Sequence, residues 1–268
     1  MFEDLAVHPR VAALLDGPAI WHRVEHHDEV GSTNDVALEA VRAGAPAGLV
    51  VVADRQRAGR GRAGREWEDR PAAQGGAGSL LCTAVVADPQ TSGTLVPLAA
   101  GLAVLDAVRR QGGRPRLKWP NDVLLDGRKT AGILVERHEV DGGHVLLVGI
   151  GINTDWRGVE RTGEQAGWTS IAEASGRDVD RADLLVDLLR GLASWLHSLP
   201  TEPLRLLVAY RDACATIGAD VRVSFPDGDQ LTGRAVDLDR EGRLVVESPQ
   251  GPVAINAGDI EHLRPQDS

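Results

Sequence analysis

The stretch K-W-P-N-D-V-L-L-D-G-R-K, residues 118–129, contains both lysines of this 268-residue chain. The chain has 27 arginines, so arginine supplies nearly all of its basic side chains. An ammonium is a compact point charge on a flexible stem, and a guanidinium is a broad planar fork. A chain that uses lysine only here is expected to use these two amines for chemistry. The stretch also contains Asp126-Gly127, a two-residue turn typical of a β-hairpin, so it predicts two antiparallel strands.

The polar residues at the start of this stretch allow two interpretations. Pro120 and Asn121 are common turn residues, and a tight turn with Trp119 in the core would explain them without any function. Lys118 and Asp122 beside them favour a functional turn, because lysine is so rare in this chain. Three of the four asparagines lie in similar short turns, namely G-S-T-N (31–34), W-P-N-D (119–122) and G-I-G-I-N (149–153). This distribution suggests that separated segments form one site.

Hydrophobic periodicity predicts an alternation of strands and helices on both sides of the hairpin. Short apolar runs indicate strands at residues 21–26, 49–53, 80–87, 123–125, 131–137 and 144–152. Amphipathic segments with capping residues, glycine or proline at their ends indicate helices at residues 9–15, 33–43, 94–110, 184–196 and 204–215. Between them, residues 54–78 form a long loop rich in glycine, arginine and charge, and a loop of this length inside a compact domain is usually functional or disordered.

The pattern changes after Gly218. Short strands separated by turns such as Pro226-Asp227-Gly228 and Glu241-Gly242 are expected at residues 221–225, 231–238, 244–247 and 253–256. Closely spaced short strands of this kind predict a small β-barrel at the end of the chain. We therefore expect two domains, residues 1–215 and residues 216–268.

The composition is that of an ordinary globular protein with an acidic balance. The 29 lysines and arginines face 39 aspartates and glutamates, which gives a formal net charge of -10. This balance disfavours general binding to nucleic acid or to anionic membranes. Cys82 and Cys214 offer no disulfide framework or metal-binding spacing, so they are expected to be small core residues. Without a signal peptide or an apolar run long enough to cross a bilayer, the chain is expected to be cytoplasmic.

The segment Q-R-A-G-R-G-R-A-G-R, residues 56–65, allows three interpretations. Its G-x-G-x-x-G spacing matches a dinucleotide-binding loop, but that loop opens a helix, which Pro71 and Gly75-Gly76 exclude here. A nucleic-acid contact is a second interpretation, although no aromatic residues are interleaved with the arginines. A mobile anion-binding loop is favoured, because glycines expose backbone N–H groups and arginines bind phosphate or carboxylate. This interpretation also lets Trp67 stack on a base.

Glycines interrupt two of the apolar strands. Gly132 lies in A-G-I-L-V, and Gly149 and Gly151 alternate in G-I-G-I-N, so one face of each strand is bare. A β-bulge would explain such glycines, and close approach by a ligand is the alternative. Gly132 favours a functional Lys129 over an ordinary lysine on a surface hairpin. Ser32-Thr33-Asn34 begins a helix, whose N–H groups could either be capped or bind polar ligand atoms.

Taken in order, the motifs closely resemble those of biotin protein ligases: G-S-T-N, Q-R-A-G-R-G-R-A-G-R-E-W, K-W-P-N-D, R-K-T-A-G-I-L-V-E and G-I-G-I-N-T. The resemblance continues to about residue 264, where G-R-A-V-D-L-D-R-E-G-R-L and G-D-I-E-H-L-R are similar to that family's SH3-like domain. It implies an α/β fold of the α+β type: a mixed, largely antiparallel sheet with flanking helices, class II synthetase-like, followed by a small SH3-like β-barrel. It also implies that biotin is activated with ATP to biotinyl-5′-AMP and passed to one lysine of a biotin carboxyl carrier domain.

The resemblance also implies roles for individual residues. Those expected to bind biotin or cover it are Ser32, Thr33, Asn34, Gln56, Arg60, Gly61, Arg62, Lys129 and Gly132. Those expected to bind ATP are Arg65, Trp67, Lys118, Asn121, Asp122, Gly151 and Asn153. Lys129 and Arg62 are the expected catalytic residues, because fixed cations reduce the repulsion between a carboxylate and the α-phosphate. Mg²⁺ is expected to accompany ATP, held mainly by phosphate oxygens; the sequence identifies no protein ligand for it.

Many bacterial relatives carry a winged-helix repressor domain before the S-T-N turn. Only 31 residues precede Ser32 here, so we expect a monofunctional ligase with no nucleic-acid partner and no membrane partner. Two alternatives remain open at this point: a lipoate or other acyl ligase, and a non-enzymatic module that binds nucleic acid through its arginines.

Overall fold

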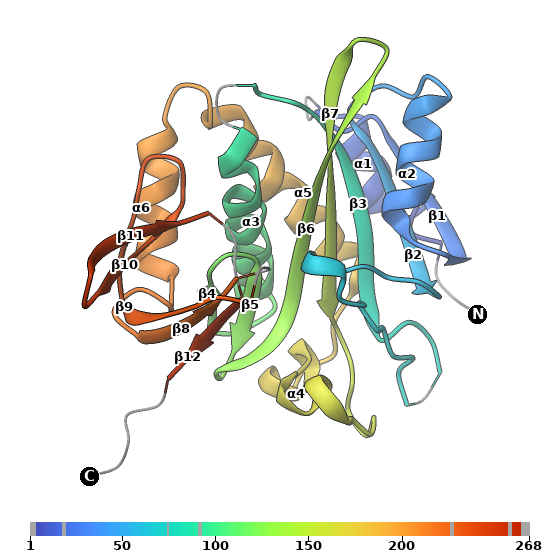
Figure 1. Ribbon diagram of the computed structural model, residues 1–268. Helices are drawn as coiled ribbons and strands as arrows, with labels where there is room; N and C mark the ends of the chain where they lie inside the picture. Colours follow the sequence, from blue (N-terminus) through green and yellow to red (C-terminus); the bar gives the residue numbers. More distant parts are fainter. Residues whose placement is uncertain are drawn as a thin grey trace.

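A seven-stranded sheet forms the centre of the molecule, in the order β1-β2-β3-β7-β6-β5-β4 (Figure 1). This computed structural model describes residues 4–17, 20–73, 75–90, 93–225, 228–256 and 259–263. The strands are β1 (Arg23–Val30), β2 (Leu49–Gln56), β3 (Ser79–Ala87), β4 (Pro115–Lys118), β5 (Asp122–Leu125), β6 (Arg128–Val140) and β7 (Gly143–Asn153). Strands β1 and β2 are parallel and the other neighbours are antiparallel, so the expected mixed, largely antiparallel sheet is confirmed.

Two tight turns set the pairing of β5, β6 and β7. Asp126 and Gly127 have φ angles of 50° and 74°, and Asp141 and Gly142 have φ angles of 51° and 75°. Positive φ at both central residues gives a twist that matches the strands of a hairpin, and glycine adopts it without strain. The turn predicted at residues 126–127 is therefore confirmed, and it brings Lys129 back beside β5.

Helices cover both faces of the sheet. They are α1 (Pro9–Leu15), α2 (Thr33–Arg42), α3 (Val96–Arg110), α4 (Ile171–Ser175), α5 (Arg181–Ser198) and α6 (Pro203–Ala213), of which only the short α4 was not predicted. Residues of α1, α3, α5 and α6 form one continuous core with one face of the sheet. Helix α2 packs on the opposite face, where Leu147 is fully buried. Truncation of Leu147 to alanine is expected to lower the free energy of unfolding by about 2–5 kcal/mol. None of the described helices has the length and apolar character needed to cross a membrane.

The face of the sheet beside α2 contains a hollow. Even-numbered residues of β7, from Leu146 to Ile152, belong to the main core on the other face. Because successive side chains of a strand point to opposite faces, Gly149 and Gly151 lie on the α2 side. Thr83 of β3, which is paired with Gly149, is also small and lies on this side. Small residues on adjacent strands therefore leave space above the sheet.

Residues after 216 form a second, antiparallel sheet in the order β11-β10-β9-β8-β12. Its strands are β8 (Asp220–Ser224), β9 (Gln230–Leu238), β10 (Leu244–Ser248), β11 (Gly251–Ile255) and β12 (Asp259–His262); β12 was not predicted. The expected closed barrel is not found, because no pairing in the described part of the chain joins the end strands β11 and β12. Alternating patterns predict strands, but closure depends on strand tilt and stagger, which such patterns do not encode. Residues 226–227 of one expected turn lie outside the described residues.

Trp119 attaches the second sheet to the first. Its indole Nε1 donates a hydrogen bond to Gly242 O at 3.0 Å, and its backbone N donates to Thr216 Oγ1 at 3.1 Å. Val221 and Val246 belong to the same core as the first sheet. Trp119 is therefore a core residue, as the simple-turn interpretation of this segment expected, while its neighbours face the site described below.

Two details near the core were decided by packing. Strand β1 runs over Arg23–Val30, later than the expected 21–26, because its pairing with β2 begins at Arg23 and Leu49, and the indole of Trp21 is buried and donates to Leu189 O at 2.8 Å. Cys82 and Cys214 are both buried, which confirms the expectation that they are small core residues.

Candidate active site

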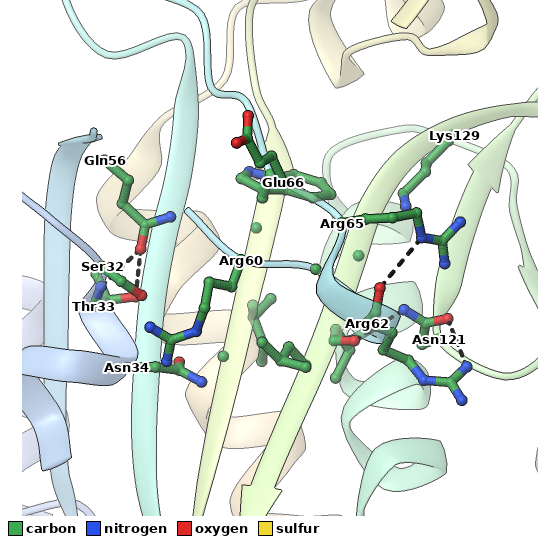
Figure 2. A pocket seen from close by; sticks show the side chains of 18 of the residues that line it. Ser32, Thr33, Asn34, Gln56, Arg60, Arg62, Arg65, Glu66, Asn121 and Lys129 are labelled. Carbon is green, nitrogen blue, oxygen red and sulfur yellow. Dashed lines mark hydrogen bonds between the residues drawn. The ribbon is translucent and has the colours of Figure 1, made fainter. Parts of the chain in front are cut away.

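A cavity of about 650 Å³, including the part open to solvent, lies over the hollow beside α2 (Figure 2). Its floor consists of glycines from β6 and β7, and the start of α2 forms one wall. The segment between β2 and β3 crosses over it, and residues 57–67 of this segment are called the lid. Three tryptophans that pack together close the side opposite α2. The predicted site segments thus meet at one place, although they are far apart in the sequence.

The floor of the cavity requires glycine. Gly132 of β6 and Gly151 of β7 are directly paired. A Cβ atom added to Gly151 would lie 2.6 Å from the Trp67 ring, and one added to Gly132 would lie 2.7 Å from the same ring. Contacts this short do not occur between real Cβ atoms and rings, so the glycines allow Trp67 to lie flat on the sheet. Both glycines are therefore explained by the close approach of Trp67, where the sequence had suggested a ligand, and their pairing contains no β-bulge.

The start of α2 presents polar groups to the cavity. Ser32 is the N-cap residue, but its side chain makes no capping hydrogen bond. Thr33 donates from its backbone N and from its hydroxyl to Gln56 Oε1, at 2.7 and 2.9 Å. The side chain of Gln56 therefore caps the helix from a neighbouring strand and fixes its own orientation, with Oε1 toward α2 (Figure 2).

Asn34 lies over the floor with both its amide oxygen and its amide nitrogen hydrogen-bonded to the protein. Its Oδ1 accepts from the Thr83 hydroxyl at 2.5 Å, and its Nδ2 donates to Glu136 Oε2 at 2.6 Å. A Cβ atom at Gly149 would collide with the same Oδ1. Asn34 lines the cavity, as predicted, but its donors and acceptors already serve contacts within the protein.

The lid is a small hairpin that lies across the cavity. Gly61 N donates to Arg65 O at 2.7 Å, and Trp67 N donates to Gly59 O at 2.9 Å. The guanidinium of Arg62 reaches Asn121 Oδ1 at 3.4 Å on the far side (Figure 2). These contacts give an ordered lid with arginines at both ends of the cavity. In the described part of this segment, only a single 3-10 turn (Arg62–Gly64) follows β2, and not an α-helix, so the dinucleotide-binding interpretation is wrong.

Arg60 differs from the other lid arginines in its surroundings. Its Nη1 lies 2.5 Å from Asp35 Oδ1, and its Nη2 lies 3.1 Å from Glu136 Oε2. The hydrogen bond to Asp35, followed by that to Glu136, raises the pKa of the Arg60 guanidinium above its ordinary value. Its charge is therefore balanced by carboxylates of the protein.

Lys129 stands at the opposite end of the cavity from Arg60. Its Nζ lies 2.7 Å from Asp122 Oδ1, and the two side chains are each 20% exposed. The ammonium also lies over the rings of Trp67 and Trp168, with centroid distances of 5.3 and 4.9 Å. A cation over aromatic faces is attracted by the ring quadrupole. These contacts hold the amine at the cavity and leave it partly accessible.

The tryptophan cluster gives Trp67 a different environment from the one expected. Trp67 is 7% exposed, and its ring centroid lies 5.0 Å from that of Trp168. Trp168 also stacks on Trp156 at 6.1 Å. Trp67 was expected to stack on a base, and in this structure its ring packs against Gly132 and Gly151 of the floor. Trp168 lines the cavity, and a lone tryptophan in the polar stretch G-E-Q-A-G-W-T, between two glycines and a threonine, was the sequence signal that could have identified it.

Most of the predicted site residues line this one cavity. They are Ser32, Thr33, Asn34, Gln56, Arg60, Gly61, Arg62, Arg65, Trp67, Asn121, Lys129, Gly132 and Gly151. Three predicted residues, Lys118, Asp122 and Asn153, do not line it. Asp122 forms an ion pair with Lys129, Asn153 donates to Thr169 O at 3.0 Å, and Lys118 lies at the end of β4. Gly149, singled out as a strand glycine, also lines the cavity, and the lining residues that were not singled out are Glu66, Ile133, Leu134, Ile150, Glu164 and Trp168.

A second cavity of about 730 Å³, again partly open, adjoins the first. Arg62, Asn121 and Ile133 line both cavities. Arg243, from the loop before β10, lines the far side of the second one. The K-W-P-N-D segment is thus the wall between the two spaces, and the C-terminal sheet closes the outer one.

Comparison with known proteins agrees with this geometry. The biotin/lipoate A/B protein ligase family matches residues 28–155, and the biotin protein ligase C terminal domain matches residues 216–263. The chain is 37% identical to the biotin–[acetyl-CoA-carboxylase] ligase of Mycobacterium tuberculosis, over 94% of this chain and 93% of that protein.

Solved structures agree as well. The biotin protein ligase of Aquifex aeolicus in complex with biotin and ATP superimposes with a TM-score of 0.75 at 27% identity, over 91% of this chain and all of that one. The ligase of Leishmania major in complex with biotinyl-5-AMP gives a TM-score of 0.57 at 25% identity, over 93% of this chain and all of that one. Together with a sequence identity that extends over nearly the whole chain, these likenesses show that the chain belongs to the biotin protein ligase family.

Proposed function

We propose that the chain carries out both steps of biotin ligation in this cavity. Biotin is activated with ATP to biotinyl-5′-AMP, and the biotinyl group then passes to one lysine of a biotin carboxyl carrier domain. The relatives support the two steps: one is named as a ligase acting on acetyl-CoA carboxylase, one binds biotin and ATP, and one binds biotinyl-5-AMP. The observation that carries the proposal is the position of Lys129, between the lid arginines and the glycine floor.

The end of the cavity beside α2 is proposed to receive the ureido ring of biotin. The ring offers one carbonyl acceptor and two N–H donors. Ser32 has a buried hydroxyl without a capping role. Gln56 Nε2 takes no part in the hydrogen bond that Gln56 Oε1 accepts from the start of α2. Backbone N–H groups at the start of a helix also favour a carbonyl oxygen. A small polar ring fits this set better than a dithiolane, which has no comparable hydrogen-bonding groups.

The opposite end is proposed to hold the reacting atoms. A biotin carboxylate oxygen attacks the α-phosphorus of ATP, and pyrophosphate leaves. Both reactants are anions, so Lys129, Arg62 and Arg65 reduce their repulsion and stabilise the charge that develops in the transition state. The adjoining cavity beside Arg62 and Asn121 has room for the departing phosphates. Asn121, Gly151, Asn153 and the ring of Trp67 remain proposed contacts of the nucleotide.

In the second step, the amine of the carrier lysine attacks the carbonyl carbon of the mixed anhydride. The new C–N bond forms as the bond to AMP breaks, the amine loses a proton, and AMP leaves. No nucleophile of the enzyme is required. The lid limits the access of water to the anhydride, which would otherwise hydrolyse.

Mg²⁺ is proposed to arrive with ATP and to lower the charge of the triphosphate. Among the described residues, no group of three or more histidine, cysteine, aspartate or glutamate side chains is arranged to hold a metal. A cation held mainly by phosphate oxygens fits this set of residues, because Mg²⁺ in such sites needs only one or two protein carboxylates. Asp122, held beside Lys129, is the carboxylate we would test first.

We extend the proposal to the finer organisation of the chain. The α/β part is proposed to be class II synthetase-like, and the C-terminal sheet to be SH3-like. The domain boundary is proposed between residues 215 and 216, and the start of the matched C-terminal family region at residue 216 supports it. Action without nucleic-acid or membrane partners is supported by the acidic net charge of -10, and action in the cytoplasm remains a proposal.

The test is the mass of a carrier domain from an acyl-CoA carboxylase after incubation with the protein, biotin and MgATP. We expect the mass to increase by one biotinyl group, and to stay unchanged when the acceptor lysine of the carrier domain is replaced by arginine. A parallel incubation with lipoate tests the alternative substrate class. Modification by lipoate and not by biotin, or no modification by folded protein, would refute the proposal.

A further inference from the structure

Glu136 of β6 joins two parts of the site and was not among the residues that the sequence singled out. Its Oε2 accepts from Asn34 Nδ2 at 2.6 Å and from Arg60 Nη2 at 3.1 Å, and its Oε1 lies 3.4 Å from the same Arg60 nitrogen. We propose that Glu136 is a positioning residue, which holds the lid over the biotin end of the cavity by fixing Arg60. The inference rests on the proposed function, because that function places biotin there.

The alternation of β6 brings this carboxylate to the cavity. Gly132 and Leu134 line the cavity, and Glu136 follows at the next position on the same face. Its side chain is 27% exposed. The preceding residues of this strand form the apolar run A-G-I-L-V, and Glu136 ends this run with a carboxylate. A half-buried carboxylate at such a place needs hydrogen-bond donors, and it obtains them from α2 and from the lid.

The surroundings of Arg60 show how its charge is used. Two carboxylates from different elements, Asp35 of α2 and Glu136 of β6, lie within 3.1 Å of its guanidinium. A cation neutralised in this way is poorly suited to binding a substrate anion. Its remaining role is to hold the lid in place, since the two contacts tie the first strand of the lid hairpin to the α2 wall and to the floor strand β6. Arg60 therefore attaches the lid, while Lys129 and the other lid arginines meet the anions.

Glu136 also connects the lid to the floor. Asn34 is oriented by Thr83 on one side and by Glu136 on the other, at 2.5 and 2.6 Å. The same carboxylate thus fixes a residue that lies over Gly149 and a residue of the lid. Loss of its charge should loosen the lid and leave the distant Lys129 end unchanged.

The experiment compares Glu136→Gln with Glu139→Gln. Both variants remove one negative charge from β6 at constant side-chain size, but Glu139 is exposed and takes no part in these hydrogen bonds. The readouts are KM and kcat of biotin-dependent adenylation, the biotinyl-AMP released into solution, and the rate of tryptic cleavage in the lid, where residues 57–65 include four arginines.

For Glu136→Gln we expect KM for biotin to rise roughly three- to tenfold, as partly exposed charged contacts allow, with kcat within about twofold of wild type. Lid cleavage and adenylate release should increase, and biotin should protect the lid less. A general structural defect would instead lower kcat and the melting temperature and would leave no specific change in the lid. The inference is overturned if the two variants behave alike in KM and in lid cleavage.

A second test does not depend on the stability of Glu136→Gln. Asp35→Asn removes the other carboxylate of Arg60 and should also speed lid cleavage. In a double-mutant cycle with lid cleavage as the readout, Arg60→Gln should abolish the effect of Glu136→Gln, because residues that act through one contact are not additive. Additive effects would contradict the inference. If the proposed function itself were wrong, wild-type protein would fail to modify the carrier domain; if only this inference were wrong, wild-type activity would remain and the variant effects would be absent.

Discussion

Lys129 and Asp122 form an ion pair of 2.7 Å at the end of the cavity where the lid meets the K-W-P-N-D segment. They lie on neighbouring strands that the turn at residues 126–127 folds together. An ammonium has three N–H donors, so the amine can bind a substrate anion while Asp122 holds its position. The pair therefore places a cation beside the glycine floor without using all of its binding capacity.

Lys129→Ala should lower the rate of biotin adenylation by about 10²- to 10³-fold, because a fixed donor to the developing charge is lost. The fold should persist, since Lys129 lies next to a surface turn and is only half-buried. The measurement is biotin-dependent pyrophosphate release, with circular dichroism as the check on folding. Arg128→Ala, which alters the exposed neighbouring cation, is the control and should keep its activity. Wild-type turnover by Lys129→Ala would remove this amine from the mechanism.

Arg62→Gly should release biotinyl-AMP before transfer, because the lid then loses its contact with Asn121 and an anion-binding group. We expect stray biotinylation of bystander lysines to rise by about tenfold or more, corresponding to a loss of about 1.4 kcal/mol in retention of the adenylate. Blotting of added serum albumin for biotin would measure it. Arg57→Gly alters an exposed lid arginine paired with Glu29 and should not increase stray labelling. No difference between the variants would contradict the role assigned to Arg62.

Gly151→Ala should displace Trp67, because the added methyl would lie 2.6 Å from its ring. We expect a loss of stability of about 1–3 kcal/mol, typical of overpacking, together with weaker binding of biotin and ATP. Gly143→Ala on the same strand is the control, since its added Cβ meets only Val140 O at 3.8 Å. Thermal unfolding and ligand-induced shifts of Tm measure both effects. An unchanged Tm for Gly151→Ala would show that the floor tolerates a side chain.

A buried ionic cluster on the other side of β2 should make stability depend on pH. His26 Nε2 lies 3.1 Å from Asp54 Oδ1, and this contact with the carboxylate is the main cause that raises the pKa of His26 above its ordinary 6.5. A raised pKa stabilises the folded state fully below pH 6.5, and this contribution is lost as the pH rises through the folded pKa.

Wild-type protein should therefore lose more stability between pH 6 and pH 8 than His26→Gln does. Urea unfolding of both proteins at several pH values provides the comparison. Equal slopes for the two proteins would show that His26 does not titrate in this range. Asp54 acts in the opposite direction at lower pH: burial by itself would raise its pKa, but the contacts with His26 and Arg181 hold that pKa below the ordinary value. Its contribution is lost as the pH falls through that lowered pKa.

Several features of the site were predictable because they depend on local chemistry. Glycine at residues 132 and 151 and the D-G turn at residues 126–127 each express a backbone requirement that few residue types satisfy. Rare residues such as Lys129 and Asn121 indicated function because the chain offered so few alternatives. Trp168 and Glu136 were not identified, since their importance lies in what faces them across the sheet and not in their neighbours along the chain.

The sequence by itself determined the order of strands and helices, the hairpin turns and the set of motifs that belong together. Apolar periodicity, capping residues and turn residues act over a few positions, so they can be read along the chain. Only the tertiary structure decided that Trp67 covers the glycine floor, that Arg60 is neutralised by Asp35 and Glu136, and that the C-terminal strands form an open order. These outcomes depend on which side chains meet across elements distant in sequence, and that is fixed by packing the whole chain around one core.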